Sequence, residues 1–372
     1  MLTAEPSPLR SLQAGTWFKL ICGASYQALP AIRNLAITYA LAGADCIDVA
    51  ADPAVVAAAR EGIDIAAKVA HQNQRTFSRP WLMVSMSAGE DPHFRKAWFD
   101  ASRCPSDCAR PCESVCPADA IAESGVVRDR CYGCGRCLPI CPLGLIEAQS
   151  QPTTVDDIAR DVLTQADALE IHTQVGQFDA VKLLWEKLQP YASHLKLIST
   201  SCPDGEGFID YLDQIRELIT ADTSAASRRR AAVMWQTDGR PMSGDIGKGT
   251  THAAIKLAQK VLASDLEGFV QLAGGTNQYT IDKLRSLNIL SQPFNHQFLD
   301  RQLTNDKKNG DHTVLKTVAG VAYGSYARHL LMPVLEETLY LEEVPTDLWK
   351  AVALAESLVK PLKLSAVSSR VS

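Results

Sequence analysis

The sequence contains no run of about 18 consecutive apolar residues, the length that a membrane-spanning helix needs, so we expect no transmembrane segment. It also has no excess of basic residues, because 37 lysines and arginines against 42 aspartates and glutamates give a formal net charge of −5. A strongly basic balance is typical of nucleic-acid-binding proteins, so we expect no nucleic-acid partner. The first residues, MLTAEPSP, show no basic segment followed by an apolar one, as a secretory signal peptide would.

The chain does contain many cysteines. Eleven occur among 372 residues, and eight of them lie between positions 104 and 141. Because the chain shows no export signal and reduced thiols persist in a reducing compartment, we expect a cytoplasmic location. Cys22, Cys46 and Cys202 lie in or at the end of apolar, strand-like segments, and we interpret them as small buried hydrophobic residues.

The eight clustered cysteines form two motifs. The second motif reads C-x2-C-x2-C-x3-C-P and matches the run found in bacterial ferredoxins; its members are Cys131, Cys134, Cys137 and Cys141. The first motif reads C-x3-C-x3-C-x3-C-P and has one extra residue in each of its first two gaps; its members are Cys104, Cys108, Cys112 and Cys116. In two-cluster ferredoxins the fourth cysteine of a run binds the other cluster.

This spacing predicts two iron–sulfur clusters. Three thiolates on one tight loop can occupy three corners of a cluster, and the fourth ligand then comes from the other motif. We assign one [4Fe-4S] cluster to Cys104, Cys108, Cys112 and Cys141. We assign the other [4Fe-4S] cluster to Cys131, Cys134, Cys137 and Cys116. If the stretched first motif holds one ligand loosely, its cluster would take a labile or [3Fe-4S] form.

Zinc sites and disulfides are the alternatives. Zinc favours separated C-x2-C pairs in sets of four, which two runs that both end in Cys-Pro match poorly. Disulfides require an oxidising compartment, which nothing in the sequence indicates. Gly133 and Gly135 support the cluster interpretation, because glycines let the backbone approach inorganic sulfur closely.

Short β-rich runs alternate with helical segments on both sides of the cysteines. Strands are predicted at 17–23, 45–50, 81–87, 168–172, 195–201, 231–236 and 268–273, while 144–148 either adds a strand or closes the ferredoxin unit. This pattern predicts an α/β fold, a (β/α)8 TIM-like barrel with an inserted bacterial-type two-cluster ferredoxin module after the third strand. A doubly wound open sheet is the alternative.

The predicted organisation has four parts. They are the first part of the barrel at 1–94, the ferredoxin-like insert with two [4Fe-4S] clusters at 95–145, the remainder of the barrel at 146–290, and a C-terminal loop with helices packing on the barrel at 291–372. Helices are predicted at 318–339 and 346–359 in the last part.

Polar residues interrupt several predicted strands. Lys19, Asp48, Glu170 and His172 share inward-facing positions, and Ser85, Lys196, Gln236 and Gln271 also lie in strands. Because an unpaired buried charge is costly, we expect Lys19 to pair with Asp48 or Glu170. The sequence leaves open whether these residues form a structural network or a ligand pocket.

Two glycine-containing segments invite comparison with phosphate loops. Gly274–Asn277 follows the last predicted strand and opens a helix, so it either binds a phosphate group through backbone N–H groups or forms an ordinary glycine turn. The segment 244–251 lacks the Walker spacing, so we do not interpret it as a nucleotide-binding P-loop. The remaining interpretation is a general anion-binding loop that uses Lys248.

Four arginines lie one or two residues from cysteines, namely Arg103, Arg110, Arg130 and Arg136. Positive charge near a cluster stabilises its reduced form, so we expect at least one cluster to have a potential above the low ferredoxin range.

The double cysteine motif, the segments WFKLICGAS and MSGDIGKGTTHAAIKLA, and the segment VQLAGGTNQYT together resemble the cyanobacterial light-dependent period family, which supplies iron–sulfur proteins to circadian light input. The resemblance implies a redox-sensing protein that relays light and photosynthetic redox state to the clock and modulates its period. It implies the clock proteins KaiA and CikA as partners, with an electron-pool redox partner. Only the eight cysteines are assigned as site residues from the resemblance, and no catalytic residue is.

Two other functions fit the same residues. A ferredoxin-linked barrel oxidoreductase, holding flavin phosphate at Gly274–Asn277, is the first. A plain electron carrier, with the barrel as a docking platform, is the second.

Overall fold

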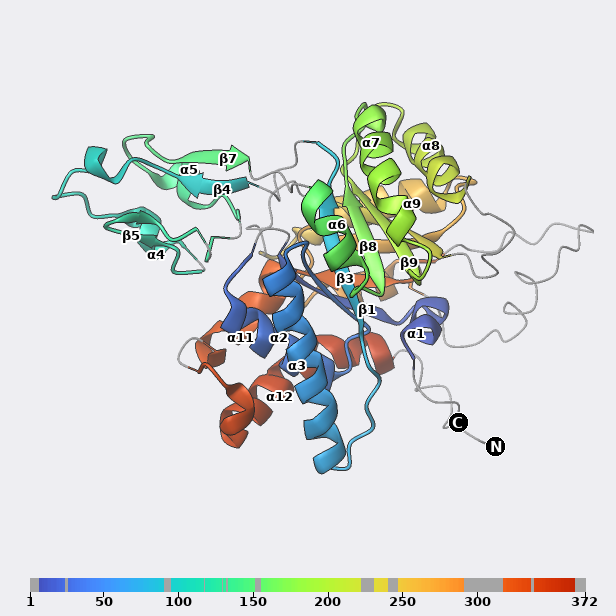
Figure 1. The fold of residues 1–372 in the computed structure, drawn as a ribbon, viewed down its shortest axis with the longest axis horizontal. Coiled ribbons are helices and arrows are strands. Elements are labelled where there is room, and N and C mark those ends of the chain that lie inside the picture. The colour runs from blue at the N-terminus through green and yellow to red at the C-terminus, as the bar shows by residue number, and fades with distance from the viewer. Residues whose placement is uncertain are drawn as a thin grey trace, which may run out of the picture.

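The chain closes eight parallel strands into a barrel, in the order β1, β2, β3, β8, β9, β10, β11 and β12 (Figure 1). This computed structural model describes residues 7–23, 26–89, 95–116, 118–128, 130–131, 133–150, 155–221, 231–239, 247–290, 317–335 and 338–364. The barrel strands are β1 (Trp17–Gly23), β2 (Cys46–Ala50), β3 (Trp81–Ser87), β8 (Ala168–His172), β9 (Leu197–Cys202), β10 (Ala232–Asp238), β11 (Phe269–Ala273) and β12 (Gly320–Tyr323). The predicted barrel is confirmed, and the open-sheet alternative is wrong.

Helices cover the outside of the barrel (Figure 1). They are α2 (Leu29–Ala42), α3 (Pro53–Gln72), α6 (Val155–Leu163), α7 (Phe178–Leu188), α8 (Phe208–Thr220), α9 (Thr251–Leu262), α10 (Thr280–Ser286), α11 (Ser325–Leu335) and α12 (Pro345–Leu364), with 3-10 turns η3 (Gln189–Tyr191) and η5 (Leu341–Glu343). Asp52 caps the start of α3, because its side chain accepts hydrogen bonds from the backbone N–H groups of Ala54 and Val55 at 2.8 and 3.1 Å. None of the described helices is both long and apolar enough to cross a membrane.

The eighth strand differs from the prediction. Of the two alternatives for 144–148, closure of the insert is correct, because β7 (Glu147–Ser150) pairs antiparallel with β4 (Arg95–Trp98). The eighth barrel strand is β12, which lies within the segment 318–339 that was predicted as one helix; α11 begins only at Ser325. A four-residue apolar run carries no periodicity that distinguishes a buried strand from a helix turn.

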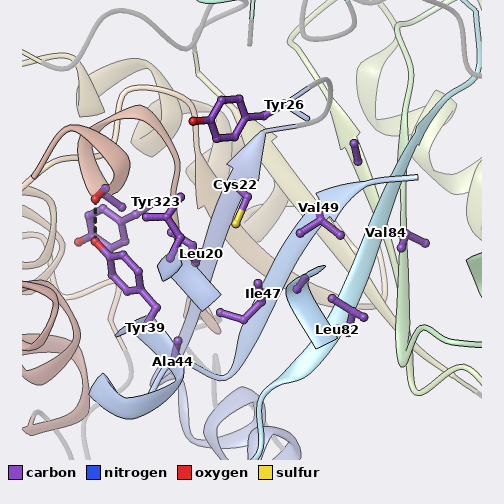
Figure 2. Packing of buried hydrophobic residues seen from close by; sticks show 14 of the residues in the cluster. Leu20, Cys22, Tyr26, Tyr39, Ala44, Ile47, Val49, Leu82, Val84 and Tyr323 are labelled. Atoms are coloured by element: carbon purple, nitrogen blue, oxygen red, sulfur yellow. Dashed lines mark hydrogen bonds between the residues drawn. The ribbon is translucent and has the colours of Figure 1, made fainter. Parts of the chain in front are cut away.

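Apolar side chains pack between the barrel strands and the helices. Figure 2 shows Leu20 and Cys22 on β1 and Ile47 on β2 in this layer, with Tyr39 of α2 beside them. The Tyr39 hydroxyl donates to the carbonyl oxygen of Ala327 at 2.9 Å, which ties α2 to α11. Cys22, Cys46 and Cys202 are all buried, as predicted.

The barrel interior changes character along its axis. At the amino-terminal end, Trp17, Met83, Leu197 and Met234 form an apolar layer, and Leu12 of α1 (Pro8–Ala14) closes it from below. Polar side chains fill the middle instead, as described below. The apolar layer and Leu12 of α1 therefore close the amino-terminal end of the barrel.

The cysteine motifs lie in an insert between β3 and β8, which projects from one side of the barrel in Figure 1. Besides β4 and β7, its elements are η2 (Ala101–Arg103), α4 (Pro111–Ser114), β5 (Ile121–Ala122), β6 (Gly125–Val126) and α5 (Cys137–Ile140). Because β3 and β8 are neighbours in the barrel, the chain leaves and re-enters without interrupting the strand order.

Closure of the barrel leaves no room for a side chain at Gly320. There β12 runs beside β1, and an added Cβ would overlap the carbonyl oxygen and the side chain of Trp17. We predict that Gly320→Ala lowers the free energy of unfolding by about 3 kcal/mol, because the backbone must shift. Gly247→Ala is the control, since its Cβ would meet open space. Equal urea midpoints for the two variants would contradict this account of closure.

Candidate functional site

Four cysteines from the two motifs line one cavity in the insert. They are Cys116, Cys131, Cys134 and Cys137. Ala97 of β4, together with Gly133 and Gly135, lines the same cavity. Both glycines have positive φ, +69° and +74°, a conformation that residues with a Cβ adopt rarely. The structure thus brings the first three cysteines of the second motif together with the last cysteine of the first motif.

The same grouping is visible in the pKa values of the thiols. Burial, together with the neighbouring thiols of Cys134, Cys131 and Cys116, raises the pKa of Cys137 to about 12. Burial also raises the pKa of Cys104, and both Cys108 and Cys141 add to that increase.

Cys112 completes the group that contains Cys104, Cys108 and Cys141. Burial raises the pKa of its thiol, and the neighbouring thiol of Cys141 adds to that increase. Each group therefore combines three cysteines of one motif with the last cysteine of the other.

Backbone N–H groups point at several of the sulfur atoms. Ala120 donates to Sγ of Cys116 at 3.3 Å, and Ala97 donates to Sγ of Cys131 at 3.4 Å. In the other group, Arg110 donates to Cys108 and Leu145 to Cys141, both at 3.4 Å. Such bonds stabilise negative charge on sulfur and are one of the factors that tune iron–sulfur potentials.

Cys141 is prepared most clearly as a thiolate. Burial raises its pKa, but the backbone N–H groups of Leu145, Leu143, Ile146 and Gly144 outweigh burial and leave the pKa of the thiol below its ordinary value. Anionic sulfur with surrounding N–H donors is the ligand that iron–sulfur clusters require, so the residues present fit such a group. Among the described residues, no three His, Cys, Asp or Glu side chains are arranged to hold a single metal ion.

The arginines near the cysteines differ in their surroundings. Arg110 forms ion pairs with Glu113 at 3.3 Å and Glu123 at 3.2 Å, which offset its charge. Arg130 donates to the backbone carbonyl oxygen of Asp119 at 3.5 Å, and Arg103 is exposed. The predicted increase in cluster potential therefore depends less on Arg110 than its position in the sequence suggests.

A buried charge network fills the middle of the barrel. Lys19 is fully buried, and its Nζ lies 2.5 Å from Oε2 of Glu170 and 3.1 Å from Oδ2 of Asp48. The predicted pairing of Lys19 is confirmed with both carboxylates. Ser85 donates to Asp48 at 2.6 Å, and Nε2 of His172 lies 3.1 Å from Oε1 of Glu170.

Hydrogen bonds extend this network across the barrel. Gln236 donates to Oε1 of Glu170 at 2.9 Å, Gln271 donates to Gln236 at 2.7 Å, and Trp17 donates to Gln271 at 2.7 Å. The network is thus continuous from β8 through β10 and β11 to β1. Lys196 does not take part, contrary to its predicted place in a strand: it precedes β9, is exposed and pairs with Asp167 at 2.6 Å.

The two carboxylates respond differently to burial. At Glu170 burial raises the pKa, but Lys19 and His172 outweigh burial and lower the pKa from its ordinary 4.5 to about 2. At Asp48 burial prevails and the pKa is raised. Glu170 therefore contributes stability that is complete above about pH 4.5 and is lost as the pH falls toward 2.

The segment Gly274–Asn277 follows β11, which is the seventh barrel strand rather than the eighth. It packs on the start of α9: Thr250, just before the helix, and Thr251, its first residue, donate to the carbonyl oxygen of Gly275 at 2.6 and 3.1 Å. The backbone N–H of Asn277 already donates to the Thr280 hydroxyl at 2.9 Å. In the proposed anion loop 244–251, residues 244–246 lie outside the described residues, and Lys248 is exposed.

One buried charged residue that bonds to both barrel and insert had no signal in the sequence. Lys96 of β4 is 3% exposed, and its Nζ donates to the side-chain oxygen of Gln27 and to the carbonyl oxygen of Arg128, both at 2.8 Å. It therefore joins the barrel loop after β1 to the part of the insert that precedes Cys131. The segment around β4 contains charged and aromatic residues without alternation, so its strand was not predicted.

Fold and site together define a class of protein, a closed βα barrel with a cysteine-rich insert of ferredoxin-like spacing. Comparison with known families agrees: residues 104–152 match the LdpA Fe-S cluster-binding domain, and residues 162–361 match the light dependent period A C-terminal domain. The chain is therefore an iron–sulfur-binding barrel protein.

Similarity to individual proteins narrows the class. The chain is 52% identical over 363 residues to light dependent period A of Synechococcus elongatus, covering 96% of this chain and 94% of that protein. The chain belongs to the light dependent period A family.

Two further likenesses are partial. Over 57 residues the chain is 42% identical to the putative electron transport protein YsaA of Escherichia coli, which covers 14% of this chain and 36% of that protein. Tryptophan synthase of Mycobacterium tuberculosis aligns with 96% of this chain and 99% of its own, at a TM-score of 0.45 and 12% identity. The fold assignment rests on the strand order of this chain itself.

The barrel network gives a direct test. We predict that Lys19→Met lowers the free energy of unfolding by about 3–5 kcal/mol, because it leaves two buried carboxylates without their cation. The matched control is Lys196→Met, which breaks an exposed pair of similar length and should cost less than about 1 kcal/mol. Urea unfolding followed by circular dichroism measures both, and similar losses would refute the network's structural importance.

Proposed function

We propose that this protein senses redox state through two [4Fe-4S] clusters and relays the state of the photosynthetic electron pool to the circadian clock. When bound, the clusters would supply reversible one-electron chemistry. The observation that carries the proposal is the cavity lined by Cys116, Cys131, Cys134 and Cys137, because cysteines of both motifs meet there. The partial similarity to a putative electron transport protein supports the same chemistry.

The ligand sets that we propose follow the two groups of thiols. One cluster would take Cys104, Cys108, Cys112 and Cys141, with a [3Fe-4S] form if one ligand is weak; the other would take Cys116, Cys131, Cys134 and Cys137. The mutual effects on the thiol pKa values support this division. We propose the insert as a two-cluster ferredoxin module at 95–145, between barrel parts at 1–94 and 146–290, with 291–372 as the C-terminal part.

A relay requires that the insert be joined firmly to the barrel, and Lys96 supplies such a joint. Its ammonium group binds the carbonyl oxygen of Arg128 in the insert and the side chain of Gln27 in the barrel. Gln27 in turn donates to Asp52, the cap of α3, at 3.3 Å. A displacement of the loop before Cys131 would therefore reach the start of α3 through three side chains.

The partners that we propose are the clock proteins KaiA and CikA, which family membership suggests, acting in the reducing cytoplasm, where cysteine thiols stay reduced. The rival function, a flavin-dependent oxidoreductase, would use Gly274–Asn277 for phosphate. Among the described contacts of that loop, the backbone N–H of Asn277 already donates to the Thr280 hydroxyl, which leaves one donor fewer for a phosphate.

Iron content of cysteine variants tests the crossed ligand sets. We predict that Cys116→Ala and Cys137→Ala each lose about half of the iron, and that the double variant loses no more than either, because both residues serve one cluster. Cys112→Ala combined with Cys116→Ala should lose nearly all of it. Cys22→Ala is the control and should keep full iron. If the Cys112→Ala, Cys116→Ala double variant instead loses no more iron than either single variant, the crossed assignment is wrong.

Partner binding tests the sensor itself. We predict that the oxidised and dithionite-reduced full chain differ at least about fivefold in affinity for KaiA or CikA, since an effector couples to binding by at least this much in typical allostery. Lys96→Met should keep its iron and reduce that difference, because the joint between insert and barrel is broken. Anaerobic biolayer interferometry measures it, and equal affinities in both states would argue against redox sensing.

A further inference from the structure

A cleft of about 670 Å³ lies between the insert and helix α11, away from the barrel interior. This volume falls within the ~300–1,000 Å³ typical of sites for small molecules. Its walls come from segments about 200 residues apart in the chain, so neither the insert nor the barrel forms it alone. In Figure 1, α11 lies below α4 and β5, on the side of the barrel from which the insert projects.

The barrel wall of the cleft is one face of α11. The helix is fixed on the barrel, because Ala327 and Leu331 are fully buried and Arg328 donates to the carbonyl oxygen of Ile21 at 2.7 Å. The face that remains presents Met332 and Pro333 to the cleft, with His329 beside them. This wall is therefore held in place before anything binds.

The insert wall comes from α4, α5 and the residues next to them. In α5, Cys137 turns inward to the cysteine cavity, whereas Pro139 and Ile140 face the cleft; Ile140 is 41% exposed. Cys116 lies in the wall of both the cysteine cavity and the cleft. A molecule in the cleft would therefore touch a residue that we assign as a cluster ligand.

The residues that line the cleft indicate which kind of molecule it can bind. Most of its surface is apolar and comes from both walls, which suits a ring or a branched hydrocarbon body. Arg136 and His329 provide N–H donors, one on each wall, while Asp119 contributes an opposing acidic group. A single anionic or carbonyl oxygen group matches this set better than a polyanion.

We propose that the cleft binds a compact, ring-bearing, mostly apolar molecule with one anionic or carbonyl oxygen group, and that Arg136 and His329 orient it next to Cys116. Binding follows from the shape and lining of the cleft alone. The consequence that the ligand would report on, or act on, a cluster rests on the proposed function.

Two fluorescent probes with the same rings test the site on the anaerobic, iron-loaded full chain. Anilinonaphthalene sulfonate carries one sulfonate, and phenylnaphthylamine lacks it. Ile140→Trp should raise the Kd of both probes about tenfold or more, because the indole occupies their volume. Val127→Trp is the matched control, since Val127 is also an exposed apolar residue of the insert, at 39%, but does not line the cleft.

The charge contact is tested separately. Arg136→Gln should raise the Kd of the sulfonate probe about tenfold, because a charge-assisted hydrogen bond is lost, and should leave the uncharged probe unaffected. Arg103→Gln is the control: it removes the same charge beside another cysteine and lies outside the cleft. Met332→Trp fills the cleft from the barrel side and serves if Ile140→Trp fails to fold.

The proposal is overturned if the wild-type chain binds neither probe, or if the filling and control variants bind both probes equally. Iron is determined on the same samples. A chain with less than the expected iron but with cleft-dependent binding would refute the two-cluster assignment and leave the cleft site standing. Full iron without cleft-dependent binding would refute the cleft site and leave the two-cluster assignment standing.

Discussion

The positive charge of Lys19 must be balanced at a place in the barrel that water does not reach. Two carboxylates, from β2 and β8, perform that task at 3.1 and 2.5 Å. Such a group of charges needs further hydrogen bonds to offset its desolvation, and Ser85, Gln236 and Gln271 supply them around the barrel. The polar layer therefore holds non-adjacent strands together across the barrel interior, and it joins strands that precede the insert to strands that follow it.

This arrangement explains how the barrel accommodates a large insertion. Strands β3 and β8 are adjacent although the whole cysteine-rich segment lies between them in sequence, and Glu170 of β8 is held by Lys19 of β1. The insert is then free to form its own antiparallel pair, β4 and β7, and its own cysteine groups. Lys96 bonds to both parts, and residues of both parts line the cleft at α11; both places lie close to cysteines of the Cys116 group.

Local patterns in the sequence predicted more than long-range ones. Cysteine spacing alone led to the grouping of Cys116 with the second motif, because ferredoxin-type ligation has a spacing rule. The partners of Lys19 were predicted because a buried charge requires a counter-charge.

Strand β12 was missed, since its four apolar residues depend on the distant strand β1 for their conformation. The predicted strand 195–201 begins two residues before β9, so the prediction placed Lys196 in a strand although it lies exposed before it. Lys96 and the cleft at α11 arise from contacts between distant segments, which no local pattern records.

The measurement that tests the central claim most directly is an anaerobic redox titration followed by EPR, with iron content and the visible spectrum taken on the same sample. The account predicts about eight irons per chain, no flavin absorption, and at least one midpoint potential clearly above about −400 mV. A flavin spectrum, or two clusters that both titrate near that low value, would contradict it and favour the oxidoreductase.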